Sequence, residues 1–146
     1  MYLNELSTGM KFEIPEVLID MDRMLDFARL YDPIPLHMDA EYAKNTRYGD
    51  IIAPGVMTFM SVWANFMRMD IFGDALIAGQ STKIEWFKPV YAGDILRGTA
   101  RITNIVRRNA YNGVCEITVD VCNQHGVLVL SDVTNSVVKY SQEAAQ

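Results

Sequence analysis

The sequence has few cysteines, no excess of basic residues and no long apolar run, and each shortage excludes a class of protein. Two cysteines in 146 residues are too few for a disulfide scaffold. Thirteen basic residues against 18 acidic ones argue against nucleic acid as a partner. The most apolar stretch, Val56–Phe72, has 12 apolar residues out of 17. It is shorter than the roughly 20 residues of a membrane-spanning helix, so we expect no membrane partner.

The composition that remains is that of a compact domain. Apolar residues make up 50% of the chain and aromatic residues 10%, which argues against disorder. We therefore predict a single domain over residues 1–146. The first 20 residues lack the basic start and the apolar run of a secretory signal. Together with the low cysteine content, this favours a cytoplasmic location.

The first half of the chain has a helical or irregular pattern. Apolar residues at helical spacing predict a short helix over Arg23–Leu30, with Asp20 or Asp22 as its N-cap. Asp39 is the expected N-cap of a second short helix through Glu41–Asn45. The long apolar stretch after the Pro-Gly pair predicts a third helix, which we expect to be buried.

The second half alternates between apolar and polar residues, as strands do. Short connections favour antiparallel hairpins between these strands. The expected strands are Ser81–Phe87, Asp94–Arg107, Val114–Asn123 and Val127–Tyr140, with an edge strand near Lys11–Ile14.

One apolar helix and a long antiparallel sheet predict an α+β fold in which the sheet wraps around the helix, the hotdog architecture. Such a sheet keeps a free edge, so we expect a homodimer.

Two histidines narrow the search for a general base. His125 lies in a turn signal between two strands, which predicts a solvated side chain. His37 follows Asp32 by five residues across a segment with two prolines. The prolines favour an extended Asp32 and Ile34, so we expect this stiff segment not to be helical.

A carboxylate and an imidazole that meet at one point can hold a water and move its proton. The alternative is structural: Asp32 ends the preceding helix and His37 packs locally. The sequence has no His or Cys pair at metal-ligand spacing and no Gly-x-Ser-x-Gly motif, so we expect no metal site and no serine hydrolase.

The segment Ala53–Met57 leads into the apolar helix. A helix N-terminus presents unpaired N–H groups that can stabilise a carbonyl oxygen gaining negative charge, and Gly55 allows close approach. The alternative is a simple helix-start turn. The apolar side chains farther along could line an acyl tunnel, but core packing is the favoured interpretation for most of them (Met57, Phe59, Met60, Trp63, Phe66 and Met67).

Residues 81–108 carry six basic and two acidic side chains, a net charge of +4, which leaves −9 for the rest of a chain with a total of −5. Either this segment is a solvated strand face or its basic residues bind a phosphate-bearing ligand.

Several blocks of the sequence resemble the MaoC-like family, which includes the (R)-specific enoyl-CoA hydratases. Phe27–Asp39, followed by Glu41–Ala43, resembles the family's hydratase motif, approximately F-A-x-L-(S/T)-x-D-x-N-P-(L/I)-H-x-D and then A. Tyr48-Gly49 with Ile51–Thr58 resembles F-G-x-x-I-A-H-G-M. Phe87–Leu96 is similar to F-x-x-P-V-x-x-G-D-x-L. The blocks follow the family's order.

The resemblance implies a hotdog fold, a homodimer or a dimer of dimers, and an acyl thioester of CoA or of acyl carrier protein as substrate. No cofactor is implied beyond the CoA of the substrate. Asp32 and His37 match the family's catalytic residues, which activate a water for addition across the 2,3 double bond or for the reverse dehydration. Gly55 matches the glycine whose N–H binds the thioester oxygen. The other residues expected to contact the substrate are Ile34, Pro54, Val56 and Met57.

Two departures from the family pattern keep other functions open. Ile34 stands where the family has Asn, and Pro54 stands where it has His. These changes motivate a second hypothesis, a non-catalytic acyl-CoA-binding protein. A third is a hotdog thioesterase, although the central helix lacks that enzyme's acid and Asp70 comes only at its end.

Overall fold

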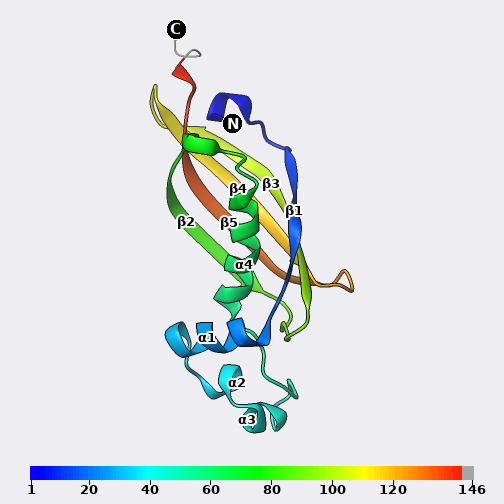
Figure 1. The fold of residues 1–146 in the computed structure, drawn as a ribbon. Coiled ribbons are helices and arrows are strands. Elements are labelled where there is room, and N and C mark those ends of the chain that lie inside the picture. The colour runs from blue at the N-terminus through cyan, green and yellow to red at the C-terminus, as the bar shows by residue number, and fades with distance from the viewer. Residues whose placement is uncertain (143–146) are drawn as a thin grey trace.

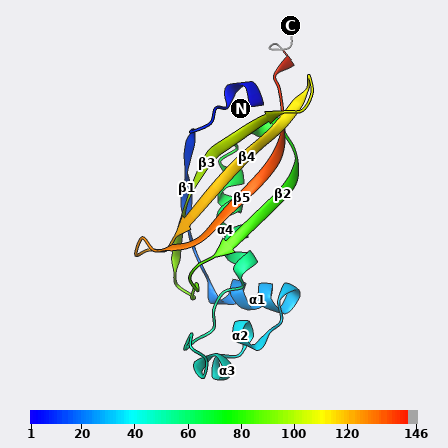
Figure 2. The ribbon, with the colours of Figure 1, turned by 180° about the vertical axis from the view of Figure 1, so that it is seen from behind.

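The computed structural model describes residues 1–142, and its main feature is one five-stranded antiparallel sheet. Figure 2 shows the strands side by side in the order β1-β3-β4-β5-β2. Their bounds are β1 (Lys11–Leu18), β2 (Leu76–Trp86), β3 (Ile95–Arg107), β4 (Asn112–Cys122) and β5 (Leu128–Lys139).

The helix α4 (Gly55–Arg68) lies along one face of the sheet, and the sheet curves around it (Figure 1). Its buried side chains, among them Val62 and Phe66, join the inward-facing residues of the strands in one hydrophobic core. The helix packs mainly on β1 and β3. A Cβ on Gly98 of β3 would lie 2.6 Å from Cγ1 of Val62, so a glycine is needed where helix and sheet come closest. The expected α+β arrangement is confirmed.

Three short helices gather at the end of the molecule where α4 begins, and the N-terminus and the end of β5 lie at the opposite end (Figure 1). They are α1 (Met21–Tyr31), α2 (Pro35–Met38) and α3 (Ala40–Lys44). The expected N-caps are confirmed, because Asp20 accepts a hydrogen bond from the N–H of Arg23 and Asp39 accepts one from Tyr42. Two single-turn 3-10 helices, η1 (Leu3–Glu5) and η2 (Gly73–Ala75), were not expected from the sequence.

The expectation that the segment around His37 is not helical was wrong. Ile34 is extended as predicted, but it is the N-cap of α2, with Pro35 at the first helical position. A proline there loses no hydrogen bond and has a suitable φ, so the same residue that interrupts one helix starts the next.

The hairpin prediction was wrong for one connection. β2 does not pair with β3, the next strand along the chain; it pairs with β5, and β2 and β3 lie in different parts of the sheet. β2 also begins at Leu76, five residues before the predicted start. The edge strand β1 extends to Leu18 and passes Pro15 through a register shift, which an edge strand tolerates.

Candidate active site

The site is built around a contact between His37 and Asp32. Nε2 of His37 lies 3.2 Å from Oδ2 of Asp32. The imidazole is buried, with 8% of its side chain exposed, whereas 44% of the Asp32 side chain is exposed. Asp32 is the C-cap of α1 and His37 belongs to α2, so the proline-rich link between these helices brings the pair together. Asp32 thus both ends a helix and meets the histidine.

The other ring nitrogen of His37 fixes the orientation of the ring. Nδ1 lies 2.7 Å from the carbonyl oxygen of Ile52, which can only accept a hydrogen bond, so Nδ1 carries a proton. Nε2 is therefore the nitrogen that can exchange a proton. At 3.2 Å, Nε2 and Oδ2 of Asp32 are too close for a water to fit between them, so a water that contacts both groups must lie beside the pair.

The same short segment joins the histidine to the start of α4. The N–H of Ala53, next to Ile52, donates to the carbonyl of Val90 at 2.8 Å. Ile52 thus contacts α2 on one side while Ala53 contacts the chain after β2 on the other. Since α4 begins only two residues after Ala53, these bonds fix the position of His37 relative to Gly55.

The start of α4 has backbone donors without a hydrogen-bond partner among residues 1–142. Its N-cap is Pro54, which has no side-chain group to accept hydrogen bonds from the first turn. The carbonyl of Gly55 accepts from the hydroxyl of Thr58 at 2.6 Å and from Nε1–H of Trp86 at 2.9 Å. A Cβ on Gly55 would lie 2.6 Å from the indole ring of Trp86, so this position needs glycine.

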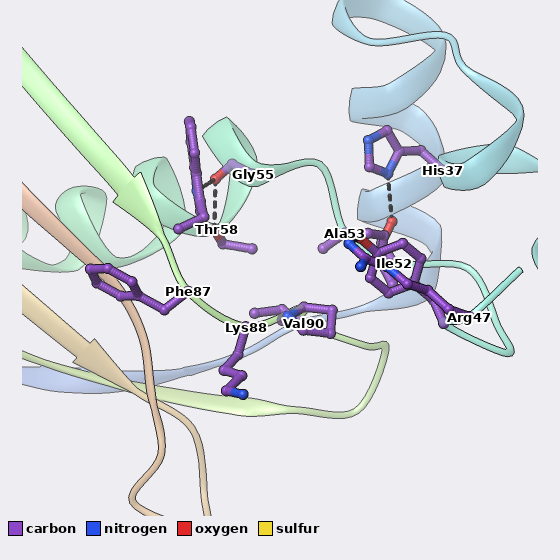
Figure 3. A pocket seen from close by; sticks show the side chains of 12 residues that line it. His37, Arg47, Ile52, Ala53, Gly55, Thr58, Phe87, Lys88 and Val90 are labelled. Atoms are coloured by element: carbon purple, nitrogen blue, oxygen red, sulfur yellow. Dashed lines mark hydrogen bonds between the residues drawn. The ribbon is translucent and has the colours of Figure 1, made fainter.

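His37 and Gly55 line one cavity of about 450 Å³, which we call the first cavity (Figure 3). Asp32 contacts His37 but does not itself line this cavity. The residues Ile34, Pro54, Val56 and Met57, which were expected to contact the substrate, do not line it either. Val56 is 48% exposed, and Met57 is buried in the core. The other residues that line the first cavity are Arg47, Tyr48, Ile52, Ala53, Thr58, Trp86, Phe87, Lys88, Pro89 and Val90.

The basic residues of the segment 81–108 do not act together at this cavity. Lys88 is the one that lines it. Arg97 forms an ion pair with Glu16 at 2.9 Å, and Arg101 lies 3.4 Å from Asp120. The first cavity gains a second cation from an unexpected place, Arg47 in the loop after α3.

Sequence reasoning missed Trp86, Arg47, Thr58 and the carbonyl of Ile52. Thr58 gave a local signal, because a threonine three residues after Gly55 can bond back to its carbonyl. No local pattern could identify the Ile52 carbonyl, since any residue has one.

The remaining candidates lie elsewhere. His125 is exposed in a turn, as predicted. Asp70 follows the end of α4 opposite to Gly55, with φ of 55°. Among residues 1–142, no three His, Cys, Asp or Glu side chains are grouped closely enough to hold a metal ion. No helix within this range has the length and apolar character needed to cross a bilayer.

Comparison with solved structures supports the resemblance seen in the sequence. The monoamine oxidase regulatory protein from Archaeoglobus fulgius superposes with a TM-score of 0.92 at 25% identity, over 97% of this chain and 95% of that one. A MaoC-like dehydratase from Rhodospirillum rubrum superposes with a TM-score of 0.83 at 24% identity, over 97% of this chain and 98% of that one. The R-hydratase PhaJ1 from Pseudomonas aeruginosa superposes with a TM-score of 0.77 at 23% identity, over 96% of this chain and 86% of that one.

A family model described as the FAS1-like, dehydratase domain region matches residues 7–132, most of the chain. With the sheet wrapped around α4 and the similarity to MaoC-like dehydratases, this match settles the family. The chain belongs to the FAS1-like dehydratase family and has the hotdog fold of the MaoC-like dehydratases.

Proposed function

We propose that this protein is an acyl-thioester hydratase or dehydratase, which adds water across the 2,3 double bond of an enoyl thioester or removes it from the 3-hydroxyacyl product. The observation that carries the proposal is the Asp32–His37 contact beside a cavity whose other wall is the free start of α4. The R-hydratase PhaJ1, which has the same fold, adds support from outside the chain.

In the proposed reaction, one water lies beside the pair and is held by Nε2 of His37 and the carboxylate of Asp32. The base takes a proton from the water as the oxygen forms a bond to C3 of the substrate. The π electrons of the double bond then move toward the thioester carbonyl, which becomes an enolate. Transfer of the proton to C2 completes the addition, and dehydration follows the same steps in reverse.

The role proposed for Gly55 is to stabilise that enolate. Its N–H belongs to the first turn of α4, where backbone donors have no partner within the helix. A developing negative charge near a helix N-terminus is also favoured by the helix dipole. The Thr58 and Trp86 hydrogen bonds to the Gly55 carbonyl hold this peptide in place.

We propose that the substrate is delivered on a phosphopantetheine arm, the part that CoA and acyl carrier protein share. Lys88 and Arg47 line the first cavity and supply positive charge for the phosphate of such an arm. The guanidinium of Arg47 stacks on the ring of Tyr48, 4.8 Å from its centroid, and its Nη2–H donates to the hydroxyl of that residue. The reaction requires no cofactor besides the CoA of the substrate.

We also propose a homodimer formed along β2. This strand is exposed over most of its length, and one of its edges has no strand beside it among residues 1–142. Ile77 on β2 is 50% exposed, which is unfavourable in water. A second copy paired along β2 would cover both features. Sedimentation of an Ile77→Lys variant as a monomer beside a dimeric wild type would support this interface, and a monomeric wild type would contradict it.

The function is tested by following the enoyl-thioester absorbance when the purified protein is mixed with a series of trans-2-enoyl-CoA substrates. We expect hydration by the wild type and a fall in kcat of about 10²–10⁴-fold in His37→Ala and Asp32→Asn. His125→Ala is the matched control, because His125 is exposed in a turn and should leave the rate unchanged.

Three outcomes would contradict the proposal. Hydration that persists in both variants would show that Asp32 and His37 do not carry the reaction. Binding of every enoyl-CoA without turnover would indicate the non-catalytic acyl-CoA-binding protein instead, and release of free thiol would indicate a thioesterase.

A further inference from the structure

A second cavity, of about 520 Å³, lies between α4 and β2, which also line the first cavity. In the part of the chain that the structure describes, no residue lines both cavities. On α4, Gly55 and Thr58 line the first cavity, whereas the lining of the second begins at Phe59. On β2, Trp86 lines the first cavity and residues 76–82 line the second. The two cavities therefore meet the same two elements but are separated near Trp86.

The indole of Trp86 closes the space between β2 and the start of α4. Its Nε1–H donates to the carbonyl of Gly55 at 2.9 Å. A Cβ on Gly55 would lie 2.6 Å from Cε2 and 3.0 Å from Cζ2 of the ring, so the indole packs directly against the glycine backbone. No acyl chain can pass between groups in van der Waals contact. Trp86 is thus a wall of the first cavity on the side of α4.

This wall is a single side chain that the rest of the fold does not depend on. Trp86 is 47% exposed and is not part of the hydrophobic core. Ile84, the next residue on the same face of β2, is half-buried and packs against that core. Removal of the indole would therefore enlarge the first cavity beside Gly55 while Ile84 stays in place.

The arrangement of the first cavity indicates which end of a substrate meets the indole. Arg47 is one of the cations proposed above to bind the phosphate of the phosphopantetheine arm. Figure 3 shows Gly55, Thr58 and Phe87 on one side of the first cavity and Arg47 on the other. A substrate with its thioester at Gly55 and its phosphate toward Arg47 directs its acyl chain to the side of Thr58 and Phe87. Trp86, bonded to Gly55, stands on that side.

We infer that Trp86 is a specificity-determining residue, which restricts the substrates to thioesters with short acyl chains. A crotonyl group has a single methyl group beyond its double bond and ends before the indole. A long chain must displace the ring or leave methylene groups in water, and in both cases it loses the free energy of burying them. This inference rests on the acyl-thioester function proposed above and adds the length of the acyl chain to it.

The inference is tested with the full-length protein by measuring kcat/KM for hydration of crotonyl-CoA and of decenoyl-CoA. The quantity compared is the ratio of the decenoyl-CoA value to the crotonyl-CoA value. We expect the wild type to favour crotonyl-CoA by about tenfold or more, and Trp86→Ala to raise the ratio by a similar factor. Partial unfolding of a variant cannot imitate this result, because it lowers both values by the same factor.

Trp86→Phe is the matched control, because it keeps an aromatic ring at the end of β2 but cannot donate a hydrogen bond to Gly55. We expect it to lower kcat for both substrates by the same factor and to leave the ratio low. Trp86→Leu is a second test variant in case Trp86→Ala does not fold. Since leucine is shorter than the indole, it should raise the ratio, by a smaller factor than alanine.

A binding measurement makes the test independent of turnover. Butyryl-CoA and decanoyl-CoA are saturated and cannot be hydrated, so calorimetric titration measures their affinity alone. We expect the wild type to prefer butyryl-CoA, and Trp86→Ala to lose that preference. If the wild type binds these thioesters without hydrating the unsaturated ones, this titration alone decides the inference.

Equal treatment of short and long chains by the wild type would overturn the inference and leave the acyl-thioester function standing. So would a ratio that is unchanged in Trp86→Ala and Trp86→Leu, since Trp86 would then only position Gly55. If the wild type neither hydrates nor binds any of these thioesters, the acyl-thioester function itself fails, and the inference fails with it.

Discussion

The imidazole of His37 and the carboxylate of Asp32 lie 3.2 Å apart (Nε2 to Oδ2), although they belong to different helices. The link between them contains two prolines, which limit its flexibility. A pair held in this way needs little reorganisation to bind a water, and such preorganisation is a large part of what an enzyme contributes to catalysis.

The tautomer of His37 follows from its contact with the Ile52 carbonyl. We predict that Nδ1 stays protonated in the free protein, because the carbonyl 2.7 Å away can only accept. Long-range ¹H–¹⁵N correlation spectra, assigned with a His37→Gln variant, measure the protonation of each ring nitrogen. An unprotonated Nδ1 would contradict the prediction.

Gly55→Ala should destabilise the protein by about 1–3 kcal/mol, because the new Cβ would lie 2.6 Å from the Trp86 ring. Trp86→Ala in the same chain should remove the clash, so the two changes should couple in a double-mutant cycle measured by urea denaturation. Gly79→Ala is the control, since no atom lies within 4 Å of that Cβ, and its effect should be small. Additive effects of Gly55→Ala and Trp86→Ala would argue against the clash.

Asp132 gives the stability of the protein a pH dependence. Burial raises the pKa of its carboxyl. The hydrogen bonds from Thr134 and Thr82 lower this pKa, but their effect is smaller than that of burial. Above the ordinary Asp pKa of about 3.9, the unfolded chain has lost this proton and the folded chain still holds it. The contribution of Asp132 to the free energy of unfolding is therefore full below that pH and declines as the pH rises through the raised value.

Asp132→Asn should remove this decline, because an amide can donate and accept hydrogen bonds with Thr82 and Thr134 without titrating. Urea denaturation at a series of pH values should show that the free energy of unfolding of the variant increases relative to that of the wild type as the pH rises. Parallel pH profiles for the two proteins would show that Asp132 does not hold its proton on folding.

The two cysteines should differ in reactivity. Burial, with a smaller contribution from Glu116, raises the pKa of Cys115 to about 11, so this thiol stays neutral at physiological pH. Cys122 is half-buried. We expect iodoacetamide to modify Cys122 in the native protein while Cys115 reacts only after denaturation, as peptide mass spectrometry would measure. Equal native rates would contradict the burial of Cys115.

Local features of the chain were predictable wherever neighbouring residues decide the outcome. The caps at Asp20 and Asp39 follow from a side chain that reaches an N–H three residues later. The start of α4 at Gly55 follows from the Pro-Gly pair and the apolar run behind it. Alternating side chains identified the strands. β2 nevertheless begins at Leu76, five residues before the predicted start, because Gly79 interrupts the pattern.

The sequence by itself thus determined the helix starts, the strands and the Asp32–His37 candidates. Only the tertiary structure decided which groups meet across the chain. β2 pairs with β5, the Ile52 carbonyl orients His37, and Trp86 packs on Gly55. The physical reason is that caps and alternation depend on residues a few positions apart. Strand partners, backbone acceptors and the burial of Asp132 depend instead on how the sheet closes around α4, which no short stretch of sequence encodes.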